Sequence, residues 1–208
     1  MAGSTIRGGA PEAPAADLRP GSVLDGRWRI ETLLGTGGMG SVYRAEHVHV
    51  GRKAAGKGLH PDLCRNPPER ERFRREARVA SRLRSPHVVE VLDFGEDAAG
   101  RPYLVMELLE GEPLRALLDR EGRLAPQRVV RLLRQLLDGL GAAHAEGIVH
   151  RDLKPENLWL SGAGTDELLR VLDFGIAKWS DARGDATRTQ AGLVVGTPEY
   201  LSPEQAVG

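Results

Sequence analysis

The first half of the chain shows the alternation of apolar and polar residues that is typical of β-strands. Between Trp28 and Glu46 this alternation runs on both sides of a cluster of glycines, which predicts two antiparallel strands joined by a glycine-rich turn. Three further strands are predicted, near Lys53–Leu59, Val88–Phe94 and Arg101–Glu107. A long charged helix should interrupt the series, beginning at Asn66-Pro67-Pro68 and stopped by Ser85-Pro86.

After Gly111 the period of the pattern changes from that of a strand to that of a helix. A short amphipathic helix is predicted over Pro113–Arg120 and a long one over Pro126–Glu146. The apolar stripe of the long helix consists of Val129, Leu132, Leu133, Leu136, Leu137 and Leu140. We interpret this stripe mostly as core; an interaction helix is the alternative, although the stripe is too short for a sustained heptad zipper. The pattern predicts an α+β protein of two lobes, with the ligand site in the cleft between them.

Composition adds limits to this picture. The chain has 208 residues, 40% of them hydrophobic and 28% charged, which suffices for one sizeable core or two small ones. Its 29 basic and 29 acidic residues balance, so overall charge gives no reason to expect nucleic acid or an anionic membrane as partner. Cys64 stands alone, which excludes an internal disulfide and fits a reducing cytoplasm.

Neither end of the chain predicts a membrane segment or a signal peptide. No apolar run is long enough to cross a bilayer. Residues 1–22 are rich in Gly, Ala and Pro without the apolar stretch of a signal peptide, and we interpret them as a flexible leader.

The most informative segment is polar and runs from His150 to Asn157. It reads His150-Arg151-Asp152-Leu153-Lys154-Pro155-Glu156-Asn157, and Val171-Leu172-Asp173-Phe174-Gly175 follows. Two acids, an amide and a lysine thus stand at fixed offsets, a combination that suits phosphoryl transfer. Because so many positions agree, a polar loop without chemistry is the weaker interpretation.

At these residues the chain resembles the protein kinases. The lysine at position 154 resembles that of the serine/threonine kinases, rather than the tyrosine kinases, of this family. The resemblance implies a two-lobed kinase-like α+β fold. Its N-terminal lobe, residues 23–107, would hold a five-stranded antiparallel sheet and one helix. A hinge over residues 107–111 would lead to a mainly helical, incomplete lobe over residues 112–208.

The resemblance also implies a role for each polar residue of the motif. Asp152 would accept or orient the proton of the substrate hydroxyl, and Lys154 would support the γ-phosphate of ATP. Asn157 and Asp173 would hold Mg²⁺, which Mn²⁺ could replace. His150 is interpreted as a packing residue without an acid–base role.

A second match lies in the glycine-rich turn. Gly35-Thr36-Gly37-Gly38-Met39-Gly40-Ser41-Val42 matches the kinase loop whose backbone N–H groups close over the phosphates of ATP. Dinucleotide-binding oxidoreductases share this spacing, but there a helix follows, whereas Ser41–Ala45 is predicted as a strand. The kinase interpretation is therefore favoured, and Gly-Gly-Met-Gly is similar to bacterial members of the family.

Kinases also need a lysine on the third strand and a glutamate on the next helix, and Lys57 and Glu76 fit these roles. The strand departs from the family, because Ala54-Ala55-Gly56-Lys57-Gly58 stands where Val-Ala-Val-Lys-Val is expected. The two glycines should loosen the strand by about 0.5–1 kcal/mol each. Lys57 and Ala55 still share one face, so the lysine can meet phosphate while Ala55 meets adenine.

The segment Tyr103–Gly111 resembles the hinge between kinase lobes. Met106 would be the gatekeeper, and the backbone of Glu107 and Leu109 would face the adenine edge. Trp159 would either form the floor of the adenine pocket or be a core tryptophan, and the sequence leaves both interpretations open.

Residues 176–195 resemble an activation segment. Thr187 and Thr189 occupy the place where bacterial relatives autophosphorylate, and a phosphate there could pair with Arg151. A solvated loop threonine is the alternative, and a homodimer is one route to such autophosphorylation. Because the family continues through several more helices after Gly208, we expect a fragment of a longer protein, with marginal stability and an apolar helix face open to solvent.

Two functions from different classes remain. The first is ATP-dependent phosphorylation of serine and threonine in proteins, and the second is a non-catalytic nucleotide-binding or regulatory module. For either we expect ATP as ligand, no nucleic acid, and a cytoplasmic location, although a longer parent protein could be anchored in a membrane.

Overall fold

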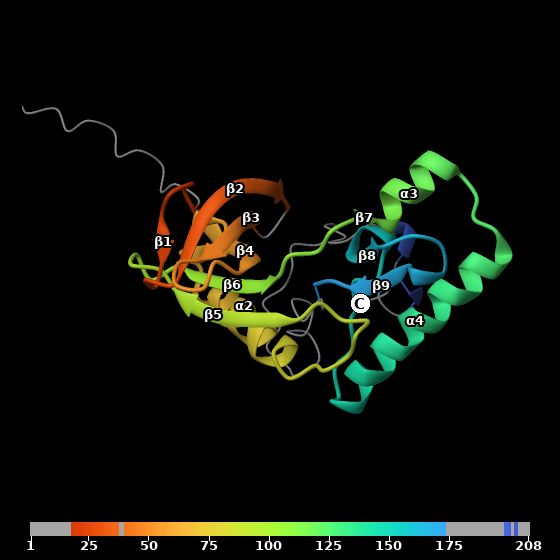
Figure 1. The fold of residues 1–208 in the computed structure, drawn as a ribbon. Helices are drawn as coiled ribbons and strands as arrows, with labels where there is room; N and C mark the ends of the chain where they lie inside the picture. The colour runs from red at the N-terminus through yellow and green to blue at the C-terminus, as the bar shows by residue number, and fades with distance from the viewer. Residues whose placement is uncertain (1–17, 38–39, 174–197, 201, 204–208) are drawn as a thin grey trace, which may run out of the picture.

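The computed structural model describes residues 18–37, 40–173, 198–200 and 202–203, which form two lobes lying side by side (Figure 1). The N-terminal lobe is built on a six-stranded sheet with the order β1-β2-β3-β4-β6-β5, in which every neighbouring pair is antiparallel. Its strands are β1 (Val23–Leu24), β2 (Trp28–Thr36), β3 (Gly40–His47), β4 (Lys53–Leu59), β5 (Val91–Glu96) and β6 (Pro102–Glu107). The five-stranded prediction therefore missed β1, a two-residue edge strand.

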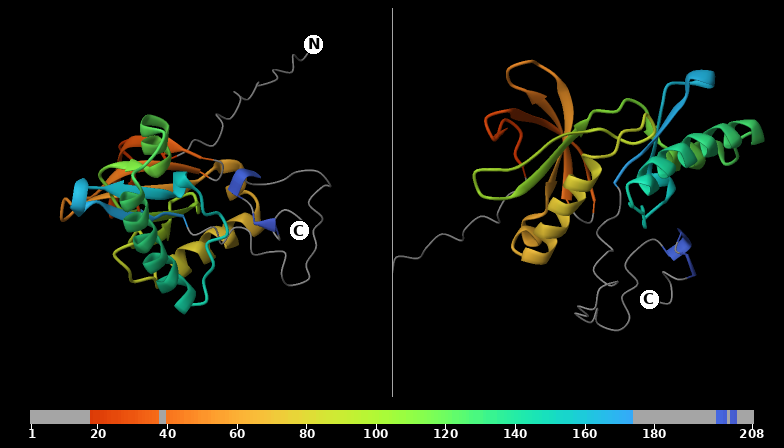
Figure 2. Two further views of the ribbon diagram at one scale, coloured as in Figure 1. Left: turned by 90° about the vertical axis from the view of Figure 1, so that its right-hand side faces the viewer. Right: turned by 90° about the horizontal axis from the view of Figure 1, so that it is seen from below.

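Helices α1 (Pro61–Cys64) and α2 (Pro67–Ala80) connect β4 to β5. Figure 2 shows α2 lying against one face of the sheet. Its residue Phe73 is 2% exposed and packs against Phe94 of β5 with the ring centroids 6.2 Å apart. The helix ends earlier than the Ser85-Pro86 signal predicts, because the N–H groups of Arg82 and Leu83 bond to carbonyls three residues back, those of Val79 and Ala80, instead of four.

The C-terminal lobe combines helices with a small sheet of order β7-β8-β9. Its helices are α3 (Leu114–Glu121) and α4 (Pro126–Ala145), and its strands are β7 (Glu112–Pro113), β8 (Leu158–Ser161) and β9 (Leu168–Val171). Short 3₁₀ turns lie at Pro155–Asn157, Gly164–Asp166 and Pro198–Tyr200. Both predicted helices are confirmed to within one residue at each end.

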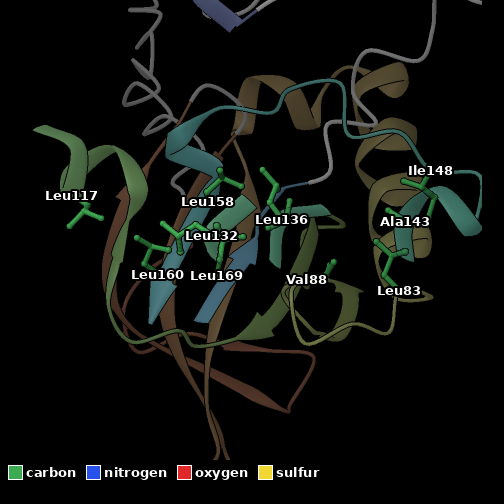
Figure 3. Packing of buried hydrophobic residues seen from close by; sticks show 11 residues of the cluster. Leu83, Val88, Leu117, Leu132, Leu136, Ala143, Ile148, Leu158, Leu160 and Leu169 are labelled. Atoms are coloured by element: carbon green, nitrogen blue, oxygen red, sulfur yellow. The ribbon is translucent and has the colours of Figure 1, made fainter. Parts of the chain in front are cut away.

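The core of this lobe forms where α4 packs on the β8–β9 hairpin (Figure 3). Leu132 and Leu136 of α4 meet Leu158, Leu160 and Leu169 of the hairpin, and all are at most 9% exposed. The other half of the predicted apolar stripe does not join the core: Val129, Leu133 and Leu137 are 37%, 49% and 64% exposed. Periodicity identified the apolar positions, but the packing partner decides which of them are buried.

Residues 87–89 form backbone hydrogen bonds that connect the two lobes. The N–H of Val89 donates to the carbonyl of Val171 at 3.1 Å, and the N–H of Val171 donates to the carbonyl of His87 at 2.9 Å. Val88 and Val89 were predicted as the start of a strand, but they leave the six-stranded sheet for this parallel bridge, so β5 begins only at Val91.

Residues 18–22 pack against the sheet, although their composition assigns them to the leader. Leu18 is 7% exposed, and the N–H groups of Gly21 and Ile30 donate to the carbonyls of Ile30 and Ser22 at 2.8 Å each. The ordered fold therefore reaches back at least to Leu18. The rest of the predicted leader, residues 1–17, lies outside the described residues. The described helices include no segment with the length and hydropathy of a membrane span.

Candidate active site

The centre of the candidate site is a contact between the two lobes. Nζ of Lys57, on β4, lies 2.8 Å from Oδ1 of Asp173, which follows β9, and the lysine side chain is 12% exposed. The loss of solvent raises the pKa of Asp173, but the charge and hydrogen bond of Lys57 outweigh this, so the pKa lies below its ordinary value. Asp173 is therefore a carboxylate at neutral pH, as a metal ligand must be.

The catalytic motif forms a second group of contacts beside it. Oδ2 of Asp152 lies 3.2 Å from Nζ of Lys154. Asn157 donates from its amide nitrogen to the backbone carbonyl of Asp152 at 2.8 Å and to the Asp152 carboxylate at 3.3 Å. These bonds orient the amide group of Asn157. Both use its nitrogen, and the amide oxygen is the atom that suits a metal ligand.

Two hydrogen bonds to Leu172 join these groups. The N–H of Leu172 donates to the carbonyl of Asn157 at 2.8 Å, and Nε2 of His150 lies 2.9 Å from the carbonyl of Leu172. Because a carbonyl only accepts, Nε2 must carry the hydrogen, and Nδ1 then accepts from the N–H of Asp152 at 3.3 Å. A chain of contacts thus brings Lys57, Asp152, Asn157 and Asp173 to one place.

The backbone at this place is held in an uncommon conformation. Arg151 has φ +61° and Asp173 has φ +42°, both in the left-handed region that side chains other than glycine rarely adopt. Arg151 directly precedes Asp152, and Asp173 is itself one of the predicted metal ligands. Such conformations persist where the surroundings enforce them, here through the bonds of His150 and Asn157.

His150 is 3% exposed, in agreement with its interpretation as a packing residue. Burial lowers its pKa below the ordinary value and outweighs the opposite effects of the Leu172 carbonyl and of Asp152 and Asp173. The folded protein therefore binds this proton more weakly than the unfolded chain does. Stability is complete above the unfolded pKa, about 6.5, and falls as the pH drops below it until the folded pKa is passed.

We expect the free energy of unfolding to decrease between pH 7.5 and pH 5.5, by at most about 1.4 kcal/mol per pH unit from His150. In His150→Gln this decrease should shrink, whereas in the control His144→Gln, at an exposed position of α4, it should persist. Denaturant unfolding at several pH values measures both. An unchanged pH profile in His150→Gln would contradict this assignment.

The described residues of the glycine-rich turn lie beside the end of β4, where Gly40 pairs with Leu59. Gly35 pairs with Val42 and Thr36 with Ser41, and the N–H of Gly37 donates to the carbonyl of Gly40 at 2.9 Å. Position 40 must be glycine, because a Cβ there would lie 1.9 Å from the carbonyl oxygen of Gly58. The strand predicted after the glycines is confirmed, which removes the dinucleotide-binding alternative.

One apolar cluster contains four of the residues that were predicted for the nucleotide site. Ala55 and Met106 are 6% and 8% exposed, and Val42 and Leu109 pack against them. Four more members were not predicted, namely Val89, Leu104, Leu108 and Leu172. Leu172 could have been predicted, because it directly precedes Asp173. Val89 belongs to no motif, and its place in the cluster depends on its backbone bond to Val171.

The predicted hinge lies between these groups and the C-terminal lobe. The N–H of Glu107 donates to the carbonyl of Glu90 at 2.9 Å. Trp159 donates from Nε1 to the carbonyl of Glu110 at 3.0 Å. Its neighbours Leu158 and Leu160 turn into the core, whereas Trp159 belongs to none of the buried clusters of the described residues.

Several predicted residues cannot be placed. Gly38, Met39, Thr187 and Thr189 lie outside the described residues, as does the side chain of Glu76, whose backbone is part of α2. Over the ranges that the structure describes, no three His, Cys, Asp or Glu side chains gather as a metal site. Asp173 and Asn157 still suit Mg²⁺, which takes one or two carboxylates and completes its shell with water and phosphate oxygens.

A cavity of about 380 Å³ lies away from these residues, between α3, α4 and the turn after β8, and is larger than the pocket of about 30 Å³ that Lys57, Met106 and Asp173 help to line. Two of the arginines that line it are already paired, Arg128 with Glu167 and Arg120 with Glu112, at 2.6 Å each. None of the residues that the sequence predicted for the site lines this cavity.

Comparisons with known proteins agree with this geometry. Residues 28–206 match the family model for the protein kinase domain. The chain is 51% identical over 192 residues to serine/threonine-protein kinase pkn2 of Myxococcus xanthus, covering 92% of this chain and 23% of that protein. It is 44% identical over 194 residues to serine/threonine-protein kinase PknA of Mycobacterium tuberculosis, covering 91% and 44%.

The crystal structure of the M. tuberculosis PknI kinase domain superposes with a TM-score of 0.66 and 32% identity, covering 77% of this chain and 62% of that one. The similarity therefore extends to the three-dimensional fold. The chain spans less than half the length of the curated relatives named above.

Proposed function

Because the chain belongs to the protein kinase family, we propose that it transfers the γ-phosphoryl group of ATP to serine or threonine hydroxyl groups of proteins. The two curated relatives named above, both serine/threonine-protein kinases, support the substrate class. The observation that carries the proposal is the 2.8 Å contact between Lys57 and Asp173. It joins residues of different lobes at the cleft where phosphates and a metal ion would have to meet.

The positively and negatively charged residues of the nucleotide site have different roles. Lys57 offers a cation to the α- and β-phosphates, while the glycine-rich turn covers them with backbone N–H groups. Mg²⁺, held by Asp173 and Asn157, would neutralise charge on the phosphate oxygens.

Asp152 and Lys154 act at the acceptor end. Asp152 orients the hydroxyl group and accepts its proton, which makes the oxygen a better nucleophile. Lys154, 3.2 Å from that carboxylate, supports the transferred phosphate. The acceptor oxygen bonds to phosphorus as the bond to the β-phosphate oxygen breaks, and ADP leaves.

We expect the chain to label a generic protein acceptor with the γ-phosphate of ATP in the presence of Mg²⁺, and EDTA to abolish the labelling. Adding Mg²⁺ back should restore the labelling. A parallel reaction with Mn²⁺ tests whether this ion can replace Mg²⁺. Phosphoamino-acid analysis should find phosphoserine or phosphothreonine. If the chain binds an ATP analogue but labels nothing under any metal, the non-catalytic nucleotide-binding module is the correct function.

Autophosphorylation is the regulatory part of the proposal. Thr187 and Thr189 would carry the phosphate, and Arg151 beside the catalytic aspartate would pair with it. One copy of the chain would phosphorylate another in a homodimer, in a cytoplasmic compartment that supplies ATP. Peptide mapping of the labelled chain tests these sites directly.

A further inference from the structure

The two glycines that flank Lys57 have different environments. A Cβ on Gly56 would meet Ile30 and Ala45 at 3.6 and 3.7 Å, which is ordinary contact. A Cβ on Gly58 would lie only 2.8 and 2.9 Å from Cδ1 and Cγ of Leu18. The space that a side chain at position 58 would need is therefore occupied by a residue from outside the six strands.

Leu18 is held firmly in this space. It is 7% exposed and belongs to the buried cluster that contains Trp28, Ile30 and Tyr103. The chain that follows it is fixed by the paired bonds between residues 21–22 and Ile30, and by the hydroxyl of Ser22, which donates to the carbonyl of Arg19 at 2.6 Å. The contact with Gly58 is thus part of the packed fold.

Gly58 also touches the glycine-rich turn. It pairs with Ser41 on one side and Tyr103 on the other, and its carbonyl oxygen closely approaches Gly40. The neighbouring Lys57 pairs with Val42 and points to the opposite face, toward the cleft. A shift of the backbone at Gly58 would therefore move both Lys57 and the base of the turn.

We propose that Leu18 is a positioning residue of the nucleotide site: it replaces a side chain at position 58 and holds the Lys57–Gly58 backbone against the glycine-rich turn. Leu18 does not touch nucleotide and acts only through β4. The proposal depends on the proposed function, since it assigns Lys57 and the turn to phosphate binding. It also explains why glycine stands at a position where the kinase resemblance expects valine.

The test is a cycle of variants on the 208-residue chain, read by the affinity for a non-hydrolysable ATP analogue with Mg²⁺. Leu18→Ala should weaken this affinity by on the order of 10-fold, because a void lets Lys57 move. Gly58→Val alone should weaken it as well, because the valine collides with Leu18. The double variant should recover most of the affinity, since valine adds as many carbon atoms as Leu18→Ala removes.

Leu24→Ala is the matched control. Leu24 is 2% exposed and lies in the same cluster, so its removal should lower stability in a similar way. A purely structural role of Leu18 predicts equal behaviour in both variants, with affinity unchanged while the protein stays folded. That result, or a Leu24→Ala variant rescued equally well by Gly58→Val, would overturn the proposal.

The affinity measurement separates this proposal from the proposed function. Wild-type chain that binds the analogue but transfers no phosphate would refute the phosphotransferase, while the cycle still decides the role of Leu18. Wild-type chain that binds no nucleotide would overturn both. Where transfer is measurable, kcat/KM for ATP should follow the same pattern as affinity across the four proteins.

Discussion

Asp152→Asn is expected to lower the rate of phosphoryl transfer by about 10²–10⁴-fold, the range for loss of a positioned proton acceptor. Asparagine has nearly the same shape, so the contacts that Asn157 makes with the backbone carbonyl at position 152 can persist. The amide lacks the negative charge and cannot take up the hydroxyl proton. Rate constants under saturating ATP and Mg²⁺ measure the effect.

Nucleotide affinity and stability separate this prediction from misfolding. Both should stay close to wild type in Asp152→Asn, because Asp152 acts at the acceptor end of the site. Asp138→Asn is the matched control, since it makes the same chemical change at an exposed position of α4 and should keep the wild-type rate. Equal rates in the two variants would contradict the role of Asp152.

The sequence predicted those parts of the fold that depend on local pattern. The bounds of β4, Lys53–Leu59, were predicted without error, and α4 ended one residue early. The motif residues could be identified because the chemistry needs particular side chains at particular offsets. That these motif residues lie close together in space could be predicted from the two-lobed topology that the resemblance implies.

Features that depend on contacts between distant segments could not be predicted. Leu18 and Ile6 are the only branched aliphatic residues among residues 1–22, but the sequence does not show that Leu18 lies opposite Gly58. In the same way, the pattern of α4 cannot show that Leu132 faces the hairpin while Leu133 is exposed, because both belong to one apolar stripe. The space beside Gly58, one of the two glycines that flank Lys57, is filled by Leu18, which lies far away in the sequence.

Lys57→Met is expected to lower kcat/KM for ATP by about 10²–10³-fold, comparable to the loss of one preorganised electrostatic group in an active site. The methionine fills similar space but offers no charge to the phosphates. It also removes the 2.8 Å ion pair with Asp173. Steady-state kinetics at several ATP concentrations, with Mg²⁺ in excess, measure the loss.

The same strand provides the control for this variant. Lys53 lies four residues before Lys57 on β4 and is 43% exposed, with Glu31 and Glu46 at 2.5 and 2.9 Å. Lys53→Met removes an equal charge but only surface ion pairs, which contribute little to stability. We therefore expect full activity in Lys53→Met. If both variants lose activity alike, the effect comes from the charge of the strand as a whole, and Lys57 has no specific role at the phosphates.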